Sequence, residues 1–115
     1  MKKIYLVEIN YEYSPTEEEC DHIFWLNEKG GGVFSTLAEA YEQLVAWYNY
    51  AWRRGVVAHL IDNSKNTITM DLVEFEVPNN FNIKKTYCES DSYLYECDYQ
   101  HEVIDCLYLC GSYEL

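Results

Sequence analysis

The chain has 115 residues, of which 49% are hydrophobic and 17% aromatic, so it can form one domain with a modest core and is not expected to be disordered. Its 20 acidic residues outnumber its 8 basic residues, which gives a formal net charge of −12. A field of this sign repels phosphate, so we expect neither nucleic acid nor a membrane surface as a direct partner and favour cationic partners instead.

The first third of the chain predicts two strands joined by a loop. Apolar and polar residues alternate over 4–13, the signature of a half-buried strand. Residues 14–21 contain Ser-Pro and three consecutive glutamates and are expected to form a solvated loop. The apolar run at 22–27 predicts a second strand, which ends at the glycine-rich turn 29–32.

The clearest pattern, at 35–55, predicts one amphipathic α-helix. Thr36 and Glu39 have the spacing of a capping box at its start, and Arg53, Arg54 and Gly55 fit its end. The apolar residues recur at three- and four-residue spacing: Leu37, Ala40, Tyr41, Leu44, Tyr48, Ala51 and Trp52. Such a stripe must be buried, and we expect a sheet to cover it.

Strand patterns return after the helix. Residues 56–61 and 67–77 predict a hairpin with its turn at 62–66. Within the second of these strands the apolar phase moves by one residue, which predicts either a bulge near Leu72 or burial of both faces there. Pro78 closes this strand.

The expected fold is α+β: an antiparallel sheet of about four strands in the order β-β-α-β-β, with one main helix packed on one face. Residues 1–115 are expected to form a single domain. Within it, 1–78 form the core, and 79–115 form an acidic, tyrosine-rich C-terminal segment. Three stretches of that segment, 83–88, 92–99 and 102–110, are rich in Tyr, Val, Ile and Cys and predict a β-rich extension.

The five cysteines include no CxxC pair, and no signal peptide or membrane-spanning run is visible, so a cytoplasmic protein with reduced thiols is expected. Cys97, His101, Cys106 and Cys110 are candidate ligands for zinc, which binds thiolates and imidazole. Their spacing differs from that of zinc knuckles, and buried thiols more often act as small hydrophobes. We therefore expect no cofactor.

No catalytic motif stands out in the sequence. The cysteines lack the glycine-rich elbow of a nucleophile, and His59 lies in an apolar run that fits a sheet. Gly30, Gly31 and Gly32 lack the lysine of a phosphate-binding loop. A non-enzymatic protein is expected, with an enzyme of unrecognised site as an alternative.

Acids and tyrosines are interleaved in the last thirty residues, where no Lys or Arg follows Lys85. Tyrosine offers stiff amphipathic contact area, and carboxylates spaced along strands can imitate phosphates toward Arg and Lys. The alternative is a solvated face that keeps the protein soluble. The predicted partner-binding residues are Glu89, Asp91, Tyr93, Tyr95, Glu96, Asp98, Tyr99, Glu102 and Asp105.

In its size, its acidity and its lack of a catalytic motif, the chain resembles small phage or mobile-element proteins that block host nucleic-acid enzymes, among them anti-CRISPR proteins and DNA mimics. The resemblance implies an inhibitor that occupies the basic nucleic-acid-binding groove of a partner, such as a nuclease of the CRISPR-effector kind. A small zinc-binding regulatory domain is the alternative of a different class. Trp25 or Trp47, expected to be exposed aromatic residues, would equally offer a homodimer face.

Overall fold

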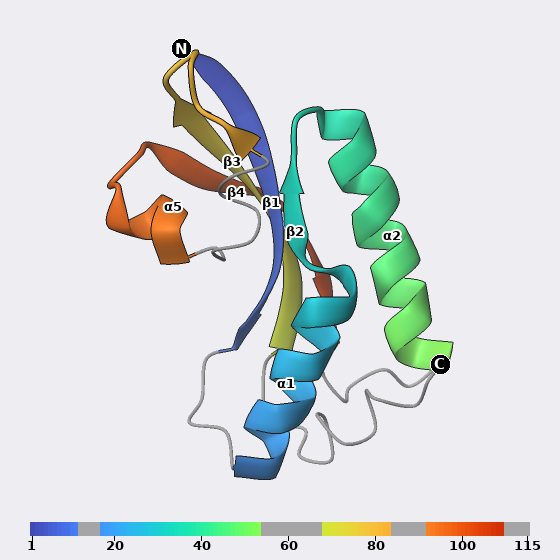
Figure 1. Cartoon of the computed structure of the whole chain (residues 1–115). Coiled ribbons are helices and arrows are strands. Elements are labelled where there is room, and N and C mark those ends of the chain that lie inside the picture. The colour runs from blue at the N-terminus through green and yellow to red at the C-terminus, as the bar shows by residue number, and fades with distance from the viewer. Residues whose placement is uncertain (12–16, 54–67, 84–91, 110–115) are drawn as a thin grey trace.

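The computed structural model describes residues 1–11, 17–53, 68–83 and 92–109. They form a four-stranded antiparallel sheet with α1 and α2 on one face and the short α5 on the other (Figure 1). The strand order is β2-β1-β3-β4, so the predicted α+β fold with one main helix is confirmed. The elements are β1 (Lys2–Tyr11), α1 (Glu17–Gly30), β2 (Gly32–Phe34), α2 (Leu37–Arg53), β3 (Ile68–Val77), α5 (Ser92–Glu96) and β4 (His101–Tyr108).

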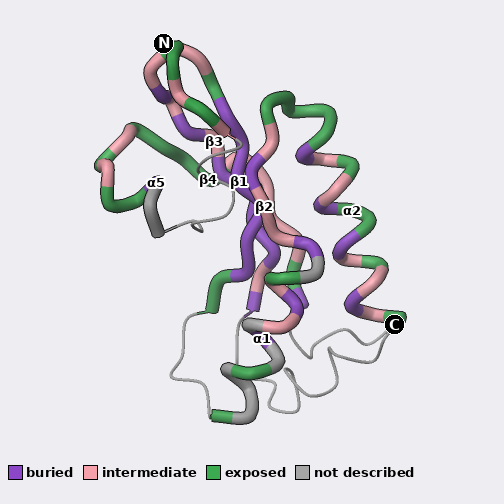
Figure 2. Tube along the Cα trace, viewed as in Figure 1, coloured by how far each residue is buried: buried purple, intermediate pink, exposed green. Residues whose placement is uncertain are grey.

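The two central strands, β1 and β3, pair over their whole length, from Lys2 opposite Val77 to Tyr11 opposite Ile68. Both strands have buried residues at consecutive positions, and these residues run along the middle of the molecule (Figure 2). Consecutive side chains of a strand point to opposite faces, so both faces of the sheet are covered. A strand pair of this kind therefore needs apolar side chains on both faces of the sheet.

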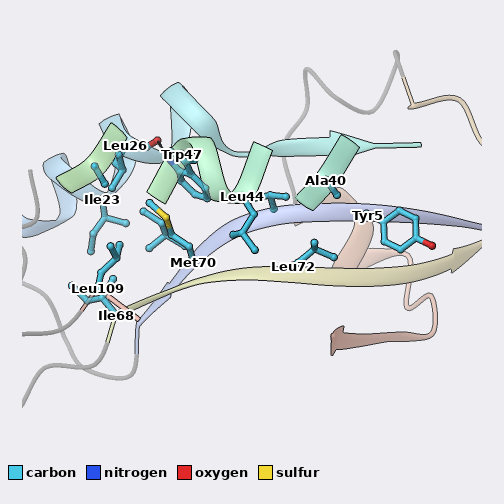
Figure 3. Close-up of a cluster of buried hydrophobic side chains, with 13 residues drawn as sticks. Tyr5, Ile23, Leu26, Ala40, Leu44, Trp47, Ile68, Met70, Leu72 and Leu109 are labelled. Carbon is cyan, nitrogen blue, oxygen red and sulfur yellow. Dashed lines mark hydrogen bonds between the residues drawn. The ribbon is translucent and has the colours of Figure 1, made fainter. Parts of the chain in front are cut away.

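The larger core lies between the sheet and the two long helices (Figure 3). Leu44 and Trp47 of α2 pack against Met70 of β3, and Leu26 of α1 closes the same cluster. Burial of a side chain of this size contributes about 1.5–3 kcal/mol. The helix predicted at 35–55 is therefore confirmed as α2, and its apolar stripe packs on the sheet as expected.

The start of α2 has the predicted cap. The Glu39 N–H donates to the Thr36 hydroxyl at 3.2 Å, and that hydroxyl donates to the Glu39 carboxylate at 2.8 Å. The carboxylate also accepts a hydrogen bond from Ser35. Glu39 thus closes the first turn through the two hydroxyls. No helix in the described part of the chain is long and apolar enough to cross a membrane.

The strand predicted at 22–27 is wrong, because these residues belong to α1. Helix α1 begins at Glu17, so the loop predicted at 14–21 also ends earlier than expected. Ile23, Leu26 and Gly30 are buried at helical spacing, which a six-residue apolar run does not distinguish from a strand. The strand that follows is the shorter β2, and the glycines at 30–32 join it to α1 instead of making a hairpin turn.

The strand predicted at 92–99 is also wrong. Residues 92–96 form α5, whose Leu94 is fully buried against the face of the sheet opposite α1 and α2. The turn after α5 contains Asp98 at φ 56°, a left-handed conformation that Asp tolerates better than most residues. The strands predicted at 67–77 and 102–110 are confirmed as β3 and β4. The strand predicted at 56–61 lies outside the described residues, as does the strand predicted at 83–88 apart from Ile83.

A bulge occurs where the apolar phase of β3 changes. Leu72 lies opposite Asp105 and Val73 lies opposite Val103, so Ile104 is the extra residue and it belongs to β4. Leu72 packs toward α2 and Val73 toward α5, and both are fully buried. The two alternatives that the sequence left open, a bulge near Leu72 and burial of both faces there, are therefore both present. Because β4 completes this sheet, its residues belong to the same sheet as β1 and β3.

Replacing Gly30 with alanine tests the contact between α1 and α2. A Cβ at this position would overlap the indole of Trp47, which is held by a hydrogen bond from its Nε1 to the Leu26 carbonyl at 2.9 Å. We expect Gly30→Ala to lower the free energy of unfolding by about 1–3 kcal/mol in urea titrations, the usual cost of overpacking. The control Ala46→Ser, at an exposed site of α2, should change it little. Equal stability of the two variants would contradict this packing.

Candidate partner-binding surface

Acidic residues are concentrated in the elements at one side of the sheet. The described residues 68–83 and 92–109, which include β3, α5 and β4, contain seven acids and no Lys or Arg: Asp71, Glu74, Glu76, Glu96, Asp98, Glu102 and Asp105. Strand β4 is the last in the strand order. This part of the molecule is therefore the source of a one-signed field.

Two of these acids lie directly opposite each other. Glu74 of β3 pairs in register with Glu102 of β4, and like charges in such positions destabilise a sheet. Lys3 offsets part of the repulsion, since its Nζ lies 3.2 Å from the Glu74 carboxylate. The hydrogen bond and charge of Glu74 raise the pKa of Lys3. Glu102 is exposed at the edge strand.

Two further acids are exposed just before β4. Glu96 is the last residue of α5, and Asp98 lies in the following turn, where its N–H donates to the Tyr95 carbonyl at 3.1 Å. We call the three exposed acids Glu96, Asp98 and Glu102 the acidic edge. They come from one stretch of seven residues, and the buried Leu94 fixes that stretch to the sheet.

The tyrosines of this region first of all pack the stretch in place. The Tyr95 ring meets Phe75 edge-on at 5.3 Å and His101 at 5.1 Å, and its hydroxyl donates to Glu8. The Tyr99 ring meets Phe81 at 5.9 Å. Burial, followed by the contact with Cys97, raises the pKa of Tyr99. Both rings thus pack the stretch that carries Glu96 and Asp98 against the rest of the fold, and Tyr95 is still 39% exposed.

Of the other predicted partner-binding residues, the structure describes the side chain of Asp105 alone. Asp105 is half-buried, accepts the Cys106 N–H at 2.8 Å and bonds the hydroxyl of Tyr41 on α2. Its side chain is therefore engaged by the main helix, apart from the acidic edge. Glu89 and Asp91 lie outside the described residues, as does the side chain of Tyr93.

The candidate zinc ligands do not form a site among the described residues. Cys97 and Cys106 are free, half-buried thiols. The His101 ring stacks on Phe75 at 4.9 Å, and its Nδ1 lies 3.0 Å from the Tyr99 carbonyl oxygen. In the described part of the chain no group of three His, Cys, Asp or Glu side chains could hold a metal ion, and Cys110 lies outside that part.

One polar cluster was not predicted from the sequence. Glu8 and Asp71 face each other across β1 and β3, yet they are only 5% and 8% exposed. The Asn10 amide donates to Glu8 at 3.2 Å and to Asp71 at 2.6 Å. The alternation of apolar and polar residues in β1 predicts that Glu8 lies on a solvated face, but apolar residues cover that face. The sequence signal was the apolar Leu6 in the same phase as Glu8, which marks this face of β1 as partly covered.

Searches against family models, curated proteins and solved structures found no match to this chain. The described residues form an α+β fold with an antiparallel sheet, whose edge strand β4 carries Glu102 and Asp105.

Reversing the charge of Glu102 tests whether the acidic pair opposes folding. Glu102→Lys converts the repulsion with Glu74 into attraction, so the free energy of unfolding should rise by about 0.5 kcal/mol in low salt. Urea titrations at low and high ionic strength measure this gain, which should shrink as salt screens the charges. A loss of stability, or a gain that is independent of salt, would contradict the repulsion.

The bond between Tyr41 and Asp105 predicts a dependence on alkaline pH. This hydrogen bond is the main reason why the pKa of Tyr41 is raised, followed by burial and the charge of Asp105. Its stabilising contribution is therefore complete below the unfolded tyrosine pKa of about 10, and it is lost as the pH rises through the higher folded value. The difference in unfolding free energy between wild type and Tyr41→Phe should shrink over that range. A difference that stays constant would contradict this bond.

Proposed function

We propose that this protein is a non-enzymatic inhibitor that binds the basic nucleic-acid-binding groove of a partner, such as a nuclease of the CRISPR-effector kind, and excludes the nucleic acid. One observation carries the proposal: exposed Glu102 lies opposite Glu74 at the edge of the sheet, in one seven-residue stretch with exposed Glu96 and Asp98. The described elements β3, α5 and β4 that carry these acids contain no Lys or Arg.

The acidic pair is costly for the fold. An opposite-charge pair at the position of Glu74 and Glu102 would stabilise the sheet, whereas this one destabilises it. Solubility alone needs less negative charge than −12 and does not need acids of two strands in register. Residues that lower stability without a local gain are typical of functional surfaces.

The acidic edge is also rigid enough to act as a template. Leu94 is fully buried, and Tyr95 and Tyr99 pack on Phe75 and Phe81. A surface that is ordered before binding loses less conformational entropy when it binds. Its carboxylates can then accept paired hydrogen bonds from arginines that hold phosphates in the free partner.

Two variants of equal charge separate local recognition from bulk acidity. The edge variant carries Glu96→Gln, Asp98→Asn and Glu102→Gln, and Asn tolerates the positive φ of residue 98. The matched control carries Asp21→Asn, Glu28→Gln and Glu42→Gln at exposed positions of α1 and α2. Each variant removes three negative charges, and thermal unfolding first establishes that both are folded.

The immobilised wild type and both variants are exposed to a purified CRISPR nuclease and to a bacterial lysate, with DNA or RNA as competitor. We expect the wild type and the control to retain a nucleic-acid-binding protein that the competitor displaces. The edge variant should bind it roughly tenfold or more weakly, which corresponds to about 1.4 kcal/mol. Equal losses in both variants would refute the assignment to the acidic edge. Retention that nucleic acid does not affect would refute the competition.

A further inference from the structure

A second pair of facing acids lies inside the protein. Glu8 and Asp71 are paired in register on β1 and β3, and they project from the face that carries Leu6 and Val73. More than nine-tenths of each residue is buried. Two carboxylates so close together in a low-dielectric interior repel each other, and each also loses its hydration.

The hydrogen bonds around the pair leave one oxygen without a partner. The Asn10 amide nitrogen contacts both carboxylates, and the Tyr95 hydroxyl donates to Glu8. The Oδ1 atom of Asp71 is buried and accepts no hydrogen bond. A buried oxygen of this kind destabilises the fold unless a ligand satisfies it.

We propose that Glu8 and Asp71 bind a hard divalent cation, namely Mg²⁺, Mn²⁺ or Ca²⁺. One such ion neutralises both carboxylates and satisfies the free Asp71 oxygen. The Asn10 amide nitrogen now contacts both carboxylates. Rotating the amide by half a turn places its oxygen at that position, and this oxygen is the third donor to the ion. Oxygen donors of this type select hard cations over zinc.

The burial of the two carboxylates distinguishes this ligand from a partner's side chain. The free Asp71 oxygen is closed to solvent, so the long side chain of an Arg or Lys from another protein would have to displace the packing around it. A small ion needs only a local opening. The hydroxyl of Tyr95 would hold the Glu8 carboxylate in orientation, as hydrogen bonds behind metal ligands commonly do.

Metal-dependent thermal unfolding tests the site without any partner protein. Protein freed of metal by a chelator is heated with Mg²⁺, Mn²⁺ or Ca²⁺ alone. At a concentration about 100 times the Kd, one of the three ions should raise the Tm of the wild type by about 10 °C. Asp71→Asn should abolish this rise and, since it removes a buried repulsion, leave the Tm of the metal-free protein equal or higher. The surface control Asp98→Asn with Glu102→Gln should keep the rise.

Manganese binding followed by electron paramagnetic resonance gives a direct count, expected to be one ion per chain for the wild type and none for Glu8→Gln. That second variant keeps the proposal testable if Asp71→Asn does not fold. No Tm rise with any of the three ions overturns the proposal. So does a rise that persists in Asp71→Asn or disappears in the surface control, since the ion would then be bound by exposed acids. Because no partner is involved, this result is independent of the inhibitor proposed above.

Discussion

The structure depends on the ladder between β1 and β3, in which ten residues of each strand pair and both faces are covered. On one face the ladder supports α1 and α2, and on the other it supports α5. Strand β4 can join the sheet because β3 offers its second edge, and the bulge at Ile104 adjusts its register there. The candidate functional residues that the structure describes are positioned through one of these attachments to the ladder.

Paired strands also explain why acids meet in this protein. Glu8 faces Asp71 in the interior, and Glu74 faces Glu102 at the edge. The two pairs have the same chemistry in different surroundings. In water the repulsion is screened, and the exposed carboxylate of Glu102 remains available to a large cationic partner, whereas Glu74 is bridged to Lys3. In the interior the repulsion and the loss of hydration are larger, so a small ion and the Asn10 amide are the suitable partners.

The sequence predicted those features whose signals are local. The cap at Thr36, the spacing of the α2 stripe and the phase change at Leu72 each occur within a few residues of the feature that they predict. Helix α1 was missed because its apolar run is short, and contact with α2 decides its conformation. The burial of Glu8 was missed because it follows from the cover that Leu94 and its neighbours place over that face. Asp105 was predicted to bind a partner because it lies in the acidic, tyrosine-rich stretch of the sequence. The register of β4 instead places it beside Tyr41.

The central claim is that the acidic edge is the surface that meets the partner. Hydrogen exchange of the backbone amides, measured with and without a captured nucleic-acid-binding protein, tests it most directly. The account predicts that amides of α5, the turn at Asp98 and the exposed side of β4 become protected while those of α1 and α2 exchange as before. Protection confined to α1 and α2, with exchange at β4 unchanged, would contradict the account.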